Sequence, residues 1–192
     1  FNKALSIDSK NVIYIRNIDR VENRIQAVWD EEIQKTSKWL SSKKLAEIGY
    51  TRQYVLTIDR SFEKDYSNNL LRDIRESAIA LTLENFKSAI VMSGSAIESI
   101  LLYLLKQKKI STYQLTNHKV SIIEAGLNDL LEISFREKLI SKNLFHFAQA
   151  IKDFRNVIHP GVEQRKKSIR VDKENANLSW IVLKKLIDES TQ

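Results

Sequence analysis

Glycine and proline are scarce in this chain, and that scarcity limits the folds open to it. Its 192 residues include four glycines and one proline. A protein of many strands reverses direction often and uses these two residues at its turns. Leu, Ile, Lys, Glu and Ser are abundant instead. We therefore predict an all-α protein whose core is large enough to be stable by helix packing alone.

Cysteine is absent, which removes disulfide bonds, thiolate nucleophiles and cysteine-based zinc or iron–sulfur sites. The imidazoles of His118, His146 and His159 are not spaced as a metal-binding motif. We expect no metal and no cofactor. The net charge of +7 and a pI near 9.5 favour an anionic partner such as RNA, DNA or an acidic protein surface. The alternative is a basic protein without such a partner.

Apolar residues recur at helical spacing along most of the chain and divide it into two parts. In the first part, residues 19–40 predict an amphipathic helix and residues 42–48 predict a short helix that ends at Gly49. Residues 50–58 are interpreted as a brief extended segment or an irregular arm. We assign residues 1–60 to a helical N-terminal extension.

The second part, residues 61–192, is helical nearly to its end and predicts an up-and-down bundle of four to five helices. Asp172 has the character of an N-cap for the last helix, and Glu174 in the first turn suits the helix dipole. Trp180 occupies an apolar helical position and is expected to pack in the core. The predicted helices cover residues 68–82, 85–108, 119–133, 141–159 and 172–189.

The longest apolar run, residues 89–105, is close to the length of a membrane span but has Glu98 at its middle. Serines and Gly94 surround this acid, a combination that a lipid-facing helix rarely accepts. No signal-peptide pattern follows Phe1, and we expect a cytoplasmic protein that does not enter the membrane. Glu98 should instead be buried in the bundle, where an unpaired carboxylate costs several kcal/mol. Arg155, in another apolar helical stretch, is the predicted ion-pair partner of Glu98.

The only proline ends a helical pattern that brings a cation, an amide and an imidazole together. Arg155 and His159 are four residues apart and share one helix face, with Asn156 beside them and Pro160 closing the element. Such a group can hold a phosphate and move a proton. Two interpretations remain open at this point: a phosphate-binding or catalytic site, and a structural cluster in which Arg155 pairs with Glu98 and His159 donates to last-turn carbonyls.

Two segments give the chain a resemblance to a known family. SAIVMSGSAIESILL (residues 88–102), followed by FRNVIHP (residues 154–160), resembles the HEPN superfamily of helical-bundle proteins, and the resemblance covers about residues 68–189. It implies a HEPN-like bundle. Many members are metal-independent endoribonucleases of toxin–antitoxin, antiphage or RNA-processing systems, and they commonly dimerise so that two motifs line one cleft. Other members are inactive and serve as dimerisation or scaffold modules, here for an activity encoded before Phe1.

By this resemblance Arg155, Asn156 and His159 are the expected catalytic residues. His159 would exchange a proton with the ribose 2′-hydroxyl or the leaving oxygen. Arg155 would stabilise charge on the phosphorane oxygens, and Asn156 would orient the phosphate or the imidazole. The spacing from Arg155 to His159 is one residue shorter than is usual for the family's catalytic motif.

A basic cluster follows this motif directly. Its cations would add salt-sensitive, sequence-independent affinity for RNA, and the alternative is a solvated loop without a partner. Together with this cluster, the resemblance implies RNA, a second copy of the chain, and an antitoxin or other protein as the expected partners. The cluster consists of Arg165, Lys166, Lys167 and Arg170.

Overall fold

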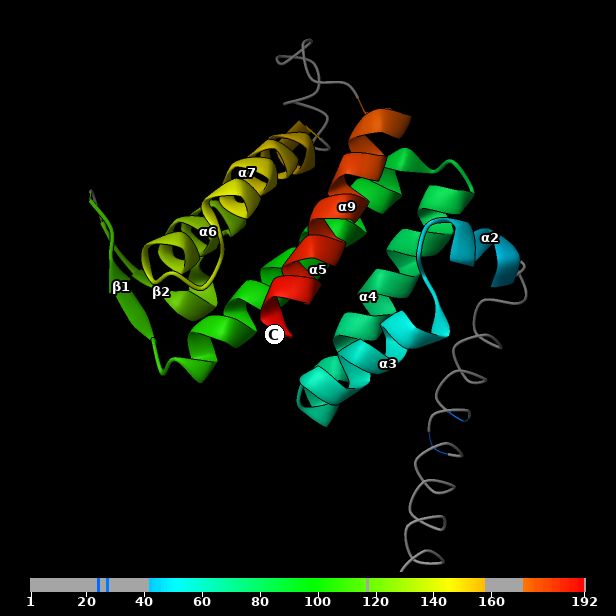
Figure 1. Cartoon of the computed structure of the whole chain (residues 1–192). Helices are drawn as coiled ribbons and strands as arrows, with labels where there is room; N and C mark the ends of the chain where they lie inside the picture. Colours follow the sequence, from blue (N-terminus) through cyan, green and yellow to red (C-terminus); the bar gives the residue numbers. More distant parts are fainter. Residues whose placement is uncertain (1–23, 25–26, 28–41, 117, 158–170, 192) are drawn as a thin grey trace, which may run out of the picture.

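The protein is an all-α helical bundle with one small β-hairpin (Figure 1). The computed structural model describes residues 42–116, 118–157 and 171–191 together with Arg24 and Ala27, and at residues 42, 65 and 152–157 it describes the backbone alone. Seven α-helices lie in this part of the chain. They are α2 (Ser42–Glu47), α3 (Arg52–Ser61), α4 (Lys64–Thr82), α5 (Phe86–Gln107), α6 (Leu127–Arg136), α7 (Lys142–Val157) and α9 (Lys173–Ser190).

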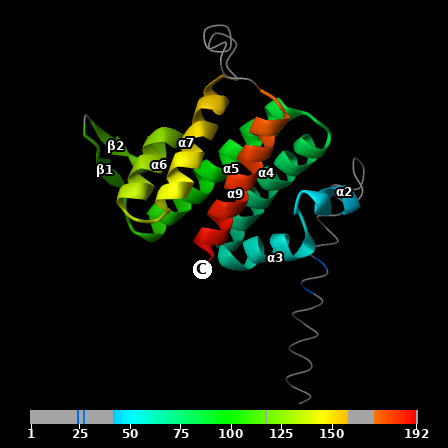
Figure 2. The same cartoon turned by 45° about the horizontal axis from the view of Figure 1, so that its top comes forward.

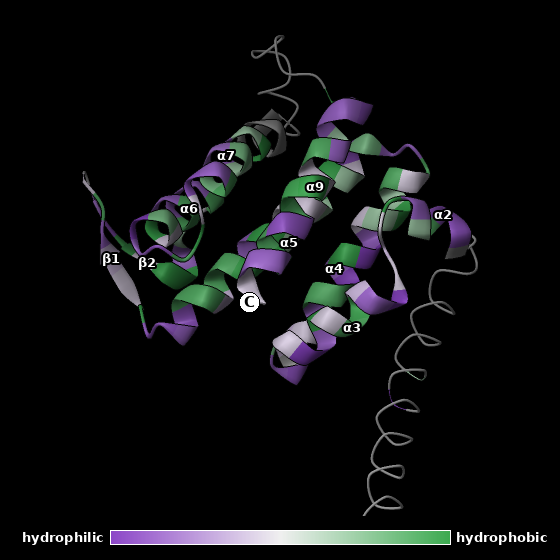
Figure 3. Cartoon of the chain, viewed as in Figure 1, coloured by the Kyte–Doolittle hydropathy of each residue, from purple (hydrophilic) through white to green (hydrophobic). Residues whose placement is uncertain are grey.

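Helix α5 is the centre of the bundle. It contacts α4, α6, α7 and α9, and Figure 2 shows it between α4 on one side and α6 and α7 on the other, with α9 crossing in front. Much of α5 is coloured as hydrophobic in Figure 3. Its Ile90, Ile97, Ile100 and Leu101 are fully buried. Burial of one such side chain contributes about 1.5–3 kcal/mol, so α5 supplies a large share of the folding free energy.

Three helices end without glycine, which explains how a chain with so few glycines can reverse direction. Glu84, Lys109 and Lys138 have φ values of 59°, 58° and 56° and follow α4, α5 and α6 respectively. At each end the next residue donates its N–H back to the last helical turn, as in the 3.0 Å bond from Ile110 N to Leu105 O. This left-handed geometry normally favours glycine, so each position stores backbone strain of about 1 kcal/mol.

The predicted extended segment at residues 50–58 is wrong from residue 52 onward. Residues 52–58 belong to α3, whose N-cap Thr51 accepts a hydrogen bond from Tyr54 N at 3.3 Å. Val55 and Ile58 are fully buried on the inner face of the helix. Aromatic and β-branched residues gave this segment a strand-like pattern, and burial against the neighbouring helices outweighed that local preference.

The predicted helix at residues 119–133 is wrong in its first half. Strand β2 (Lys119–Ser121) pairs antiparallel with β1 (Thr112–Gln114), and a 3₁₀ turn (Ile122–Glu124) leads to α6. The hairpin turn closes with a 2.9 Å bond from Leu115 N to His118 O. The conformation of this region therefore depends on pairing between two strands, which the pattern of apolar residues along the sequence does not reveal.

Helices α2, α4, α5, α7 and α9 confirm the predictions for their segments to within a few residues at the described ends. The predicted helix at residues 19–40 lies outside the described residues, apart from Arg24 and Ala27. Asp172 caps α9 by accepting from Asn175 N at 3.0 Å, and Gly49 follows α2 with a φ of +83°. Trp180 is buried as expected, and its Nε1 donates to the carbonyl of Ile48.

The hydrophobic core extends into the segment that we assigned to the N-terminal extension. Leu45 in α2, Tyr50 before α3, and Val55 and Ile58 in α3 are fully buried in the same cluster as α5 and α9. Within the described residues the packed core thus begins at Leu45, ahead of residue 60.

By length and composition α5 is the one described helix that could cross a membrane, and half of its most apolar window is buried inside the bundle. A central helix of a soluble bundle has the same properties.

Candidate functional site

Helix α7 places Arg155 and Asn156 in its last turn. The helix ends at Val157 and contacts α5, α6 and α9. Leu144, Ala148 and Ile151 are buried among the α7 residues whose side chains are described, and position 155 continues their row at helical spacing. The C-terminal end of a helix carries partial negative charge, which favours cations in the last turn. The backbone is therefore suited to hold basic groups here.

The structure does not describe the side chains of the predicted catalytic and RNA-binding residues. His159 and the basic cluster Arg165, Lys166, Lys167 and Arg170 lie outside the described residues, as do the side chains of Arg155 and Asn156. Their proposed roles stay predictions.

Glu98 is half-buried in α5, whereas the sequence suggested deeper burial. Ser93 and Gly94, one turn earlier, are buried, and α5 contacts α7. Ser93 lies where α4 comes close to α5, since its hydroxyl oxygen is 2.7 Å from that of Ser77. The predicted ion pair from Glu98 to Arg155 involves a side chain outside the described residues and stays a prediction.

A polar seam between α4 and α5 was not predicted from the sequence. The seam consists of Asp73 and Ser77 on α4 and Ser93 and Ser95 on α5. Ser77 Oγ donates to the carbonyl of Ala89 at 3.0 Å and lies 2.7 Å from Ser93 Oγ. Ser95 Oγ donates to Asp73 Oδ2 at 3.0 Å. Because these bonds are directional, the seam sets the register of the two helices more narrowly than apolar contacts alone.

The Asp73 carboxylate is an anchor in this seam. It is 5% exposed, and its Oδ1 accepts from Nε and Nη2 of the neighbouring Arg72 at 3.0 and 2.9 Å. With Oδ2 bonded to Ser95, both carboxylate oxygens are engaged. A carboxylate in this state is a poor general base, so the seam serves to position α5. The sequence does show serine and aspartate within two predicted helices. Their spacing along the chain does not indicate that these two helices pack against each other.

The two described histidines lie on the surface. His118 Nε2 is 3.5 Å from Asp129 Oδ2, with the imidazole half exposed beside the hairpin. His146 is exposed on α7 and its ring contacts Phe145. Neither belongs to a group of three or more potential metal ligands within the part of the chain that the structure describes.

An aromatic cluster joins α4 to α5. The ring centroid of Tyr103 lies 4.7 Å from that of Tyr66 and 5.1 Å from that of Phe62. Burial raises the pKa of the Tyr66 hydroxyl to about 12. This tyrosine is therefore a neutral packing residue at physiological pH.

No protein-family model, curated protein or solved structure matches the chain.

Proposed function

We propose that this chain is a HEPN-like helical bundle that binds RNA and cleaves it without a metal ion at Arg155, Asn156 and His159. The observation that carries the proposal is the position of Arg155 and Asn156 in the last turn of α7, a helix that contacts α5. This is the arrangement that the family resemblance leads one to expect. A role in a toxin or antiphage system of the cytoplasm, with an antitoxin or other protein partner, is part of the proposal.

In this proposal each of the three residues has one task. The guanidinium of Arg155 binds the scissile phosphate and stabilises negative charge that grows on its oxygens. His159, whose ordinary pKa near 6.5 allows proton exchange at neutral pH, transfers the proton of the 2′-hydroxyl or of the leaving oxygen. Asn156 orients the phosphate or fixes the imidazole tautomer.

The basic cluster supplies affinity that does not depend on RNA sequence. Arg165, Lys166, Lys167 and Arg170 follow the motif within one short stretch of a chain with net charge +7. Four phosphate contacts to a single strand would give a slope of log Kobs against log salt of about −3. Replacing all four residues by Gln should remove that contribution and leave a slope of about −0.7, from the phosphate contact of Arg155.

The test is a pair of assays on one set of proteins. Binding of a fluorescent mixed-sequence RNA is followed by anisotropy, and cleavage of the same RNA is followed on gels, both with chelator present. We expect His159→Ala to abolish cleavage while binding stays within about twofold, and Arg155→Ala to weaken both. His146→Ala, at an exposed histidine on α7, is the matched control and should leave both unchanged.

Intact RNA with the parent protein, together with salt-dependent binding, would remove the catalytic part and leave an RNA-binding bundle. Absence of binding at low salt would remove the whole proposal.

An inactive dimerisation module is the second candidate, and an exposed aromatic residue on α7 favours it. Phe147 is 47% exposed, and Lys185 Nζ of α9 lies 6.0 Å from its ring centroid. A homodimer that buries Phe147 would bring two copies of α7, and hence two Arg155 motifs, to one interface. Phe147→Glu should then convert a dimer to a monomer in light scattering, whereas Leu83→Glu, at a residue 51% exposed elsewhere, should not.

A further inference from the structure

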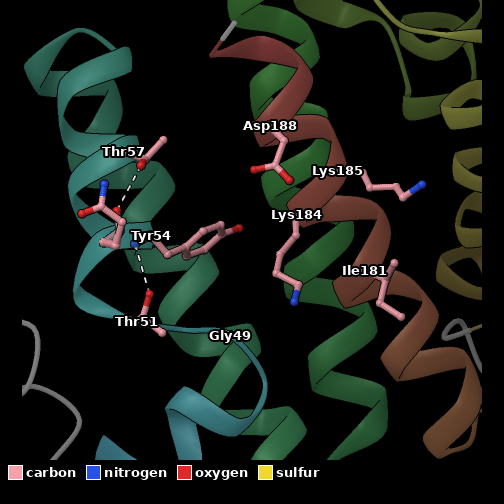
Figure 4. A pocket seen from close by; sticks show the side chains of 9 residues that line it. Gly49, Thr51, Tyr54, Thr57, Ile181, Lys184, Lys185 and Asp188 are labelled. Atoms are coloured by element: carbon pink, nitrogen blue, oxygen red, sulfur yellow. Dashed lines mark hydrogen bonds between the residues drawn. The ribbon is translucent and has the colours of Figure 1, made fainter.

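A groove of about 420 Å³ lies between α3 and α9, away from the end of α7 (Figure 4). Thr51, Tyr54 and Thr57 line it from the α3 side, and Ile181, Lys184 and Asp188 line it from α9. Its volume is in the range that small-molecule sites occupy. None of these residues belongs to the RNA site proposed above.

The ammonium group of Lys184 is held at one edge of the groove. Its Nζ donates to the carbonyl oxygen of Ile48 at 3.1 Å, and Trp180 Nε1 donates to the same oxygen at 2.6 Å. Gly49 leaves room for this arrangement, because a Cβ there would lie 2.9 Å from Nζ. An ammonium carries three N–H bonds, so Lys184 keeps donors for a ligand while its position is fixed.

The hydroxyl of Tyr54 is buried and has no hydrogen-bond partner among the residues that the structure describes. In Figure 4 the ring extends from α3 toward α9, with its oxygen facing the part of α9 that carries Lys184 and Asp188. The rings of Tyr50 and Trp180, with centroids 6.4 and 6.1 Å from that of Tyr54, hold it there. An unsatisfied buried hydroxyl costs about 1–3 kcal/mol, which a bound acceptor would recover.

Asp188 places a carboxylate on the same face of α9, one helical turn after Lys184. No ion pair engages this carboxylate among the described residues. Burial and the negative charge of Asp188 both raise the pKa of Tyr54, so its hydroxyl stays protonated and remains a donor at neutral pH. The groove thus combines two kinds of donor with one anion.

We propose that this groove binds a free α-amino acid with an apolar side chain. Its carboxylate accepts from Lys184 Nζ and the Tyr54 hydroxyl, its ammonium group pairs with Asp188, and its side chain packs on Ile181, which is 48% exposed. Lys185 also lines the groove, but its Nζ lies over the ring of Phe147, 6.0 Å from the centroid. A simple anion satisfies the donors but brings no cation to Asp188, and a simple cation leaves Tyr54 unpaired. A zwitterion satisfies all three groups.

Calorimetric titration of the full chain with leucine tests the proposal. Two derivatives serve as comparisons: N-acetylleucine lacks the ammonium charge, and leucinamide lacks the carboxylate charge. A Kd on the order of 1 mM or tighter is expected for leucine. Each derivative should bind at least about tenfold more weakly, because one of the charged contacts is lost.

The variants are Tyr54→Phe, which removes only the oxygen, and Asp188→Asn, at an exposed residue that folding should tolerate. Each should weaken leucine binding about tenfold with an unchanged circular dichroism spectrum. Tyr113→Phe, on the hairpin, is the matched control and should bind leucine as the parent does.

The proposal is overturned if leucine gives no binding heat up to about 10 mM, ten times that Kd. It is also overturned if the derivatives match leucine, or if both variants bind as well as the parent. RNA assays on the same variants should be unaffected, so failure here is separable from failure of the RNA proposal.

Discussion

Ser77 on α4 and Ser93 on α5 place their hydroxyl oxygens 2.7 Å apart at a point where both residues are fully buried. Ser77 also donates to the carbonyl of Ala89 on α5. Two small polar residues therefore tie the central helix to its neighbour inside an otherwise apolar core, and the consequence can be measured.

Ser77→Ala should lower the free energy of unfolding by about 1–3 kcal/mol, because Ser93 then lacks its partner in a buried environment. Ser77→Ala/Ser93→Ala should cost less than the sum of the two single changes, since the double variant leaves no unpaired hydroxyl. Urea unfolding followed by circular dichroism measures both. The exposed Ser61→Ala is the control and should have little effect. Strict additivity of the pair would contradict the contact.

Asp73→Ala should destabilise the protein by about 1–3 kcal/mol, because Ser95 loses its acceptor and Arg72 loses two hydrogen bonds. Asp73→Asn, which keeps an acceptor oxygen for Ser95, should lose less. Glu76→Ala, at an exposed position on the same helix, controls for the change in charge. Equal midpoints for the Asp73→Ala and Glu76→Ala proteins would show that the seam does not hold α4 to α5.

Gly49→Ala should destabilise the protein by more than about 1 kcal/mol. The residue has a φ of +83°, and the added Cβ would meet Lys184 Nζ. Gly126→Ala is the matched control, because nothing lies within 4 Å of its Cβ position. We expect that variant to stay within about 0.5 kcal/mol of the parent, since reduced chain entropy offsets a poorer N-cap. Thermal denaturation of the two proteins gives the comparison.

Lys109→Gly should raise the free energy of unfolding by about 0.5–1 kcal/mol, because glycine relieves the left-handed backbone at the end of α5. Lys108→Gly removes the same charge one residue earlier, where φ is −78°, and should not stabilise. A lower unfolding midpoint for Lys109→Gly than for the parent would refute the strain argument.

Stability should fall steeply as the pH rises from about 10 to about 12. In the unfolded chain Tyr66 loses its proton near its ordinary pKa of 10.0, whereas in the folded protein its pKa is about 12. The unfolded state binds fewer protons in this window, so the free energy of unfolding decreases with pH. Tyr66→Phe should make the decrease shallower above pH 10 and leave the pH dependence near pH 8 unaltered. Urea midpoints across this range provide the measurement, and parallel curves for the two proteins would contradict the assignment.

Local patterns predicted the helices that are long and amphipathic. The boundaries of α4, α5, α7 and α9 agree with the sequence because capping residues such as Asp172 and apolar periodicity act over one or two turns. The same short-range signals failed at α3 and at the hairpin of β1 and β2. In those segments the outcome depends on contacts with residues distant in sequence.

The sequence alone determined the helical class, the basic charge and the Arg155, Asn156 and His159 motif, since these follow from composition and spacing. Only the tertiary structure decided that Asp73 meets Ser95 across two helices. It also decided that Tyr54 and Asp188, 134 positions apart in the chain, line one groove. The physical reason is that helix packing brings side chains together through burial of apolar faces, and no local pattern records which faces will meet.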